Sequence, residues 1–224
     1  MTPLLSEPMR AFKFLDPNGA TMFGGGPWPL PTGDEPGPWV QAVSVHPCHS
    51  GIHACDVGDL AYWIGAELWE IELDGEIERS HHKVVASRGR LVRRIDGWAG
   101  GVAAQLPRWC AWRTRDRAVN VLAGVGLDQW AARFDAAGTL DEVSRIATEA
   151  IDSLGDVSVG GSAAALAGDA AELVDWLAIG AFIAACAAGH SARRDTGSEA
   201  DYAAAFAAER RIQSAWIAAE LQLV

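Results

Sequence analysis

The segment from residue 46 to residue 55 holds the densest group of reactive side chains in this sequence. It contains three of the six histidines and two of the four cysteines, in the order His46-Pro47-Cys48-His49-Ser50-Gly51-Ile52-His53-Ala54-Cys55. Imidazoles exchange protons near neutral pH, thiolates are nucleophiles, and both bind soft metal ions. We therefore expect any chemistry of this protein to start in this segment.

Zinc binding is the first chemistry that the segment suggests. Zinc takes thiolate sulfur and imidazole nitrogen in four-coordinate sites, so the candidate ligands are Cys48, His53 and Cys55, with His46 or His49 beside them. The two cysteines are separated by six residues, however, and no second pair with the spacing of a zinc knuckle follows. If residues 51–55 form a strand, that strand presents at most two ligands on one face. The structural alternative is two buried thiols and one hydrogen-bonded histidine in the core.

Nucleophilic catalysis is the second chemistry. Cys48 or Cys55 needs a base or a positive field nearby, and His53 offers both. No further pattern marks an oxyanion hole or an orienting Asn or Asp. Acidic residues alternate downstream and place carboxylates on one strand face, either as a solvated surface or as a general base or ribose-hydroxyl acceptor. These residues are Glu70, Glu72, Asp74, Glu76 and Glu78.

Short β-type runs follow one another in the first part of the chain. Alternation of apolar and polar residues predicts strands over 9–15 and 67–73. We also expect a short strand over 51–55 and a strand pair over 83–95. Asp16-Pro17-Asn18-Gly19 predicts a turn, Asp74-Gly75 a hairpin turn, and residues 56–65 a short helix. The loop over 23–39 is rich in Gly and Pro, and its Trp28 and Trp39 either pack over the core or line a pocket. His81-His82 are expected in an exposed polar loop.

The second part of the chain is rich in alanine and predicts helices. These helices cover 107–122, 127–134, 139–154, 162–188 and 198 to about 223, with a glycine break at Gly160-Gly161. Thr139 and Glu142 form a capping-box pattern, and Ser198 with Asp201 predicts another N-cap. Cys110 and Cys186 are expected as small core residues. We predict an α+β fold, in which a β-rich domain over 1–97 packs against a helical domain over 98–224.

Composition argues against several classes of partner. The formal net charge of −11 disfavours a nucleic acid or an anionic membrane, because both attract clustered Lys and Arg, and the basic run 88–94 is short. Residues 1–10 lack the apolar core of a signal peptide. The longest apolar run, 176–189, has 14 residues, below the roughly 18–20 that span a bilayer, and predicts a buried helix. With four cysteines and no export signal, we expect reduced thiols and a cytoplasmic protein.

Residues 9–97 resemble an uncharacterised bacterial and phage family. Its members carry a Cys-x-x-Gly-[Phe/Ile]-His-x-Cys motif, which Cys48, Gly51, His53 and Cys55 match. A short helix and a strand ending in Asp/Glu-Gly-Glu follow in that family, and the corresponding residues here are 60–63 and 67–76. His46 and His49 are additional to the pattern. The family implies no activity.

Residues 51–62 also resemble the NAD-binding segment of transferases of the poly-ADP-ribose-polymerase type. There a Gly-Ile-Tyr-Phe-Ala strand precedes a Ser-rich helix ending in Tyr, and the segment lines the nicotinamide pocket. The resemblance implies that Gly51 and His53 line such a pocket and that Tyr62 is the stacking aromatic. It makes Glu70, Glu72 or Glu76 the carboxylate that orients the ribose, and Arg10 or Lys13 the basic residue of the first strand. This chain departs from the family in having His53 for Tyr, no Ser run and no His-Gly-Thr motif.

These patterns lead to one preferred function and two alternatives. We expect an enzyme acting on a small molecule or nucleotide, and the second resemblance implies an ADP-ribosyltransferase-like enzyme that binds NAD. The catalytic residues are then His53, Glu72 and Glu76, and Tyr62, Gly51 and Arg10 lie at the cofactor. The first alternative is a non-enzymatic binding module, in which Cys48, His53 and Cys55 hold the fold, with or without zinc, and the helices contact a protein partner. The second is a cyclase or isomerase with a Trp-lined pocket, suggested by the ten tryptophans.

Overall fold

The computed structural model describes residues 7–22 and 26–223 and divides into two compact units. One unit comprises Met1–Val102 together with Ser214–Val224, and the other comprises Ala103–Gln213. The first contains an antiparallel sheet and the second is helical, which confirms the predicted α+β class. The predicted domains divide the chain once, after residue 97, whereas the compact units divide it after Val102 and again after Gln213.

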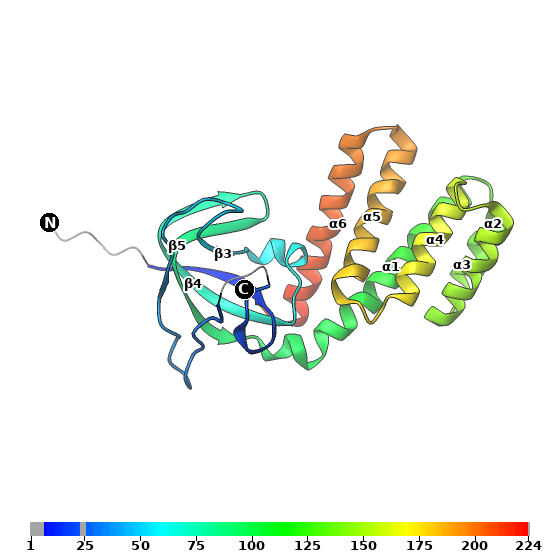
Figure 1. Ribbon diagram of the computed structural model, residues 1–224. Helices are drawn as coiled ribbons and strands as arrows, with labels where there is room; N and C mark the ends of the chain where they lie inside the picture. Colours follow the sequence, from blue (N-terminus) through cyan, green and yellow to red (C-terminus); the bar gives the residue numbers. More distant parts are fainter. Residues whose placement is uncertain (1–6, 23–25, 224) are drawn as a thin grey trace. The chain divides into compact units, whose positions relative to one another are not determined.

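The sheet of the first unit has five antiparallel strands among the described residues, in the order β1-β4-β5-β2, with β3 also pairing with β5 (Figure 1). Their bounds are β1 Met9–Leu15, β2 Val40–Gln41, β3 Ile52–Ala54, β4 Glu67–Ser80 and β5 Lys83–Arg94. A two-bond backbone bridge between Phe12 and Cys55 joins β1 to the end of β3, with N···O distances of 2.9 and 2.8 Å. The pairs β1–β4, β4–β5, β5–β3 and β3–β1 therefore close a ring of four strands. The apolar core of this unit includes Leu15, Trp28, Ile71 and Leu91.

The start of the sheet follows its prediction closely. Strand β1 begins and ends at the residues that the alternating pattern indicates. The turn after it has left-handed backbone at Asn18 (φ 63°) and Gly19 (φ 74°), the two residue types that tolerate it best. In the loop that follows, residues 23–25 lie outside the described part of the chain. Trp28 packs in the core, and the guanidinium groups of Arg88 and Arg90 lie 4.4 and 4.7 Å from the centroid of the Trp39 ring.

The predicted hairpin turn at Asp74-Gly75 is wrong, because β4 continues through these residues as a bulge. The register of β4 against β5 shifts between Asp74 and Ile77, and Gly75 has a φ of +79°. The Asp74 carboxylate accepts the Gly75 N–H at 2.7 Å, and the Ser87 hydroxyl accepts the Glu76 N–H at 3.0 Å. These bonds provide partners for the backbone N–H groups at the bulge, where β4 does not pair with β5. Pairing of β4 with β5 resumes at Ile77.

The chain reverses instead at His81-His82, between the paired residues Ser80 and Lys83. The predicted strand pair over 83–95 is a single strand, β5. The short helix predicted over 56–65 is a 3-10 helix at Val57–Tyr62.

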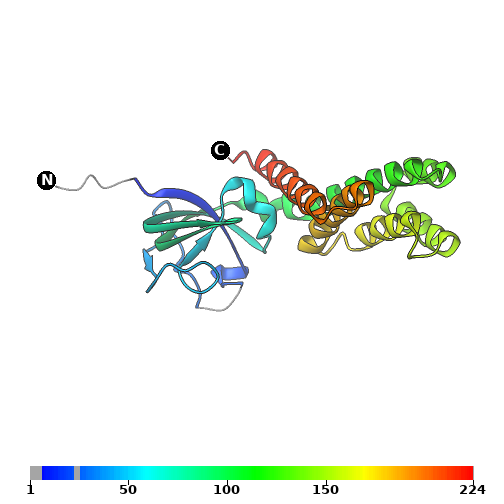
Figure 2. The same cartoon turned by 90° about the horizontal axis from the view of Figure 1, so that it is seen from above.

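The second unit is built from α-helices, preceded by a π-helical turn at Trp98–Val102 that belongs to the first unit. The helices are α1 Ala103–Gly124, α2 Asp128–Asp135, α3 Leu140–Leu154, α4 Val159–Glu172, α5 Leu177–Thr196 and α6 Glu199–Glu220. The residues of α6 from Ser214 on belong to the first unit. Helices α3 and α4 lie side by side, as do α5 and α6 (Figures 1 and 2). The reciprocal capping box of Thr139 and Glu142 is present, and the Ser198 hydroxyl accepts the Asp201 N–H at 3.3 Å. Both predicted N-caps are therefore confirmed.

The single helix predicted over 162–188 is wrong in two respects. Gly160 and Gly161 do not break the chain but form the first turn of α4, capped by the Ser158 hydroxyl. A Cβ on Gly161 would lie 1.8 Å from the Gly155 carbonyl oxygen, so this close approach requires glycine. The break comes later, between α4 and α5, at residues 173–176.

Helix α5 is less buried than its apolar sequence predicts. Trp176, at its N-terminus, and Phe182 are 61% and 50% exposed, whereas Ala184 and Ala185 are fully buried. Among the described helices, none combines the length and the apolar character needed to cross a bilayer.

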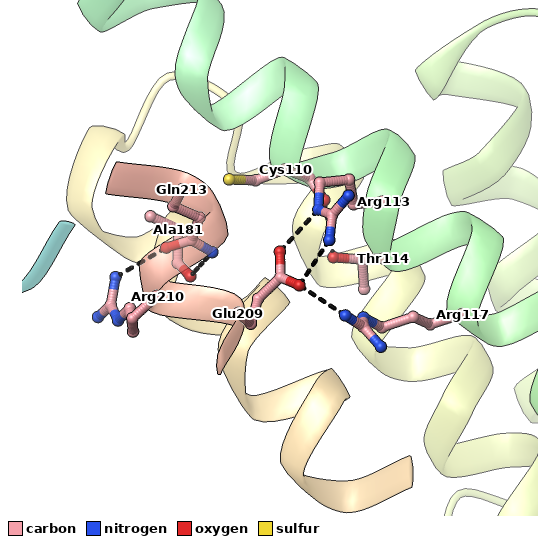
Figure 3. A network of polar contacts seen from close by, with 8 residues as sticks. All are labelled: Cys110, Arg113, Thr114, Arg117, Ala181, Glu209, Arg210 and Gln213. Carbon is pink, nitrogen blue, oxygen red and sulfur yellow. Dashed lines mark hydrogen bonds and ion pairs between the residues drawn. The ribbon is translucent and has the colours of Figure 1, made fainter. Parts of the chain in front are cut away.

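A buried ion cluster connects α6 to α1 within the helical unit (Figure 3). Glu209 has no exposed surface and accepts hydrogen bonds from Arg113 at 2.7 Å and from Arg117 at 2.5 Å. One turn further along α6, the Gln213 amide donates to the Ala181 carbonyl at 2.8 Å. These bonds give hydrogen-bond partners to the Glu209 carboxylate and the Gln213 amide, two polar groups that the last helix buries in this unit.

Candidate functional site

A cleft of about 750 Å³ opens in the sheet unit beside the 46–55 segment. Strand β1, the loop around Trp28, residues 48–55, Trp63 and the start of β5 line it. Among its described lining residues there are two lysines and two histidines but no Asp or Glu. The chain as a whole has 29 acidic and 18 basic residues, so the charge of this cleft is opposite to that of the molecule.

Lys13 extends from β1 to this cleft. Its Nζ donates a hydrogen bond to the His53 carbonyl oxygen at 2.7 Å and lies 5.1 Å from the centroid of the Trp28 ring. Burial lowers the pKa of the Lys13 amine from 10.5 to about 8, with a smaller opposing effect from Cys55. The cleft therefore contains a desolvated amine whose hydrogen-bond partner is a backbone carbonyl.

Lys83 and Cys48 contact each other at the same cleft. The Lys83 Nζ lies 2.6 Å from the Cys48 Sγ and 5.8 Å from the centroid of the Trp63 ring. Cys48 is exposed, so the prediction of two buried thiols fails for this residue. Its backbone is left-handed, with a φ of 70°, a conformation that non-glycine residues seldom adopt.

His53 holds the Cys48 loop in this conformation through both of its ring nitrogens. The Nδ1 position lies 3.1 Å from the Gly51 carbonyl oxygen, and Nε2 lies 3.3 Å from the Cys48 N–H nitrogen. These contacts fit a neutral ring that donates from Nδ1 and accepts at Nε2. Burial, together with the positive charges of Lys13 and Lys83, lowers the pKa of His53, which favours this neutral form. His53 therefore lines the cleft as a positioning residue for Cys48.

The other two motif residues have structural explanations. Gly51 has a φ of +121°, and a Cβ there would lie 2.3 Å from the Val85 Cγ1, so both backbone and space require glycine. Cys55 is buried beneath β1, where its backbone forms the bridge to Phe12. Burial raises the pKa of the Cys55 thiol, mostly by desolvation, so it remains a protonated core residue.

The three candidate zinc ligands are not arranged as a ligand set. Cys48 contacts Lys83, both nitrogens of His53 face backbone groups, and Cys55 is buried in the core. Within the part of the chain that the structure describes, no group of three His, Cys, Asp or Glu side chains is placed to hold a metal ion.

The remaining predicted site residues do not line the cleft. The Glu72 carboxylate pairs with Arg90 at 2.7 Å, and Glu76 is exposed just beyond the bulge of β4. Arg10 is exposed and lies 3.4 Å from the Glu70 carboxylate. The Tyr62 ring stacks on the His82 ring with centroids 3.5 Å apart. Thus the cleft brings together Cys48, Gly51, His53 and Cys55, but not Glu72, Glu76, Tyr62 or Arg10.

Sequence reasoning missed the two lysines. Lys13 entered only as an alternative to Arg10, and Lys83 was not considered. A signal was present in the composition, because Lys13 and Lys83 are the only lysines of the chain and the other 16 basic residues are arginines. Both line the same cleft.

Comparison of the chain with protein-family models, with curated proteins and with solved structures finds no match. The two resemblances described from the sequence therefore stay predictions, and the geometry of the cleft carries the functional argument.

Proposed function

We propose that this protein is an enzyme that binds a small anionic ligand carrying a planar ring, of the nucleotide type, in the cleft beside Cys48 and His53. The observation that supports it best is the charge of the cleft. Lys13 and Lys83 line a cavity without Asp or Glu among its described residues, in a chain of net charge −11. Such a local reversal of charge favours an anionic ligand over a cation.

The apolar part of the lining supports the planar ring. Trp28, Trp63, Phe12 and Phe14 contribute to the walls, and flat aromatic surfaces stack favourably on planar heterocycles. A cavity of about 750 Å³ lies within the range of roughly 300–1,000 Å³ usual for small-molecule sites. The Cys48 thiol and the two amines provide the nucleophiles that distinguish an enzyme from a simple binding module.

NAD remains the first ligand to test, because it combines anionic phosphates with two planar rings. Transfer of ADP-ribose has weaker support than binding, since Glu72, Glu76 and Tyr62 lie outside the lining. The supported part of the ADP-ribosyltransferase hypothesis is therefore nucleotide binding in the cleft that Lys13 and His53 line.

Calorimetric titration of the full-length protein with NAD and with ADP-ribose tests this proposal. We expect one ligand per chain, and the substitution Lys13→Met should weaken binding about tenfold or more, since it removes a charge-assisted contact worth about 1.5–3 kcal/mol. Release of nicotinamide from NAD, measured in the same samples, reports on the transfer of ADP-ribose.

Arg10→Met is the matched control, because Arg10 is the other basic residue of β1 and does not line the cleft. It should leave the affinity unchanged. Failure of the wild-type protein to bind either ligand would overturn the proposal. So would a loss of affinity in the Arg10 variant but not in the Lys13 variant, because the ligand would then lie outside the cleft.

A further inference from the structure

Both lysines of the chain lie at one cleft, although arginine supplies every other basic side chain. Arginine carries the same charge and offers more hydrogen-bond donors, but it keeps its proton in proteins. An amine, in contrast, can lose its proton and then react as a nucleophile. Two lysines confined to one cleft therefore indicate a need for amine chemistry as well as for positive charge.

The surroundings of Lys13 are those of an activated amine. None of the ion pairs among the described residues includes Lys13, and its ammonium group bonds to the backbone carbonyl of His53. Lys83 and His53 face the same cleft, so the site contains further cationic or proton-binding groups and no carboxylate among its described lining. Desolvation in an apolar pocket is a known way to make a lysine nucleophilic, and burial is what lowers the pKa of Lys13. The lowered pKa of about 8 agrees, since roughly a tenth of such an amine is neutral at pH 7.

We propose that Lys13 forms an imine with the carbonyl group of an anionic aldehyde or ketone bound in the cleft. The neutral amine adds to the carbonyl carbon and the carbonyl oxygen takes up a proton, giving a carbinolamine. The C–O bond then breaks, the oxygen leaves as water, and a C=N bond to Lys13 remains. One amine and one carbonyl are consumed and one water is released, so no oxidant or reductant is needed.

Lys83 has a different part in this proposal. Its Nζ contacts the Cys48 thiol and lies over the Trp63 ring, at the same cleft as Lys13. There it provides positive charge for the phosphate or carboxylate of the ligand. The proposal goes beyond nucleotide recognition, because it requires a carbonyl group and applies to any anion that the cleft accepts.

Pyridoxal 5′-phosphate is a suitable probe, since it combines an aldehyde, a planar ring and a phosphate. The full-length protein is mixed with a substoichiometric amount at pH 7, the imine is reduced with borohydride, and the labelled peptides are quantified by mass spectrometry. The amines that can react are the two lysine side chains and the α-amine at the N-terminus of the protein under test. The protein unfolded in urea, treated in the same way, gives the intrinsic reactivity of each amine.

We expect label at Lys13 to exceed label at Lys83 and at the N-terminal α-amine by at least about tenfold in the folded protein, because the cleft holds the bound aldehyde next to Lys13. This preference for Lys13 should disappear in urea. Lys13→Arg should remove the label without transferring it to Lys83, while Lys83→Arg should keep the preference for Lys13. Equal labelling of these amines in the folded protein, or preferred labelling of the N-terminal α-amine or Lys83, would overturn the proposal. Preferred labelling of Lys13 in a protein that binds neither NAD nor ADP-ribose would support the imine and reject the nucleotide.

Discussion

Lys13 occupies a position where a charged amine raises the free energy of the folded state. The side chain lies on the same face of β1 as the buried residues Ala11 and Leu15. Its ammonium group is compensated by one backbone carbonyl and by the Trp28 ring, with no carboxylate among the described ion pairs. A methionine or leucine at this position would fill the space without a charge to desolvate. Residues that destabilise their own fold are typical of functional sites, where activity rather than stability determines the side chain.

This cost predicts a pH-dependent effect of the substitution Lys13→Met. The pKa of Lys13 is about 8 in the folded protein, against 10.5 ordinarily. The folded state therefore binds fewer protons than the unfolded state between these values, and stability rises with pH across that window. Below pH 8 the buried charge costs about 3 kcal/mol, so Lys13→Met should be more stable than wild type at pH 7 by up to that amount. The difference should shrink toward pH 10.5 in urea denaturation curves.

Arg10→Met again serves as the control, since its exposed side chain should alter stability little at any pH. A Lys13→Met protein that is less stable than wild type at pH 7 would show that the ammonium group contributes net stabilising bonds. The stability of the variant would then no longer support the proposal that Lys13 is an activated amine.

At the same scale, the sequence identifies the position of the site but not the state of its residues. Residue types alone identify Cys48 and His53 as candidates, because the chemistry of a thiol and an imidazole follows from the side chain itself. The sequence does not show whether the Nε2 lone pair of His53 is free to accept a proton or bind a metal. In the structure this lone pair accepts the Cys48 N–H, which the left-handed backbone of Cys48 directs toward it. Likewise, the carboxylates Glu72 and Glu76 match a pattern, but the pairing of β4 decides that they lie away from the cleft.

At the scale of elements, short sequence motifs predict the ends of helices well where a side chain hydrogen-bonds to the backbone of a residue a few positions away. Helix α3 begins where Thr139 and Glu142 indicate, because the two residues of the capping box are only three positions apart in the sequence. The same kind of signal misleads at Asp74-Gly75, where cross-strand pairing with β5 overrides the local preference for a hairpin. Gly160-Gly161 suggests a break, but the close approach of Gly155 makes glycine the residue that permits the start of α4.

The capping box gives a prediction for the helical unit. Thr139→Ala removes the hydroxyl that accepts the Glu142 N–H at 3.2 Å, and should lower the free energy of unfolding of this unit by about 1 kcal/mol. Thr148→Ala on the exposed face of the same helix is the matched control, because its hydroxyl bonds only to the Ser144 carbonyl and alanine is the better helix former. Amide hydrogen exchange in α3 measures both effects. Equal changes in the two variants would contradict a specific capping role.

At the scale of the whole molecule, the last helix is joined to residues almost a hundred positions earlier. Glu209 on α6 bonds to Arg113 and Arg117 on α1, and no sequence pattern pairs residues so far apart. Burial alone would raise the pKa of Glu209, but the hydrogen bonds and charges of the two arginines outweigh it and hold the pKa below its ordinary value of 4.5. The carboxylate is thus charged in the folded protein and compensated on both sides (Figure 3).

The buried cluster predicts a specific loss of stability in acid. Because its folded pKa is lowered, Glu209 contributes stability fully above pH 4.5 and loses it as the pH falls through the folded value. Glu209→Gln should cost about 3 kcal/mol at pH 7, since two arginines lose a buried counter-charge, and its stability should decline less than that of wild type below pH 4.5. Glu149→Gln is the matched control, because Glu149 also pairs with two arginines, Arg133 and Arg145, but at the surface, where such pairs contribute about 0–1 kcal/mol. Thermal unfolding of wild type and the two variants from pH 3 to pH 7 measures these differences in stability. Equal losses of stability in the two variants would show that the contact between α1 and α6 does not depend on the Glu209 carboxylate.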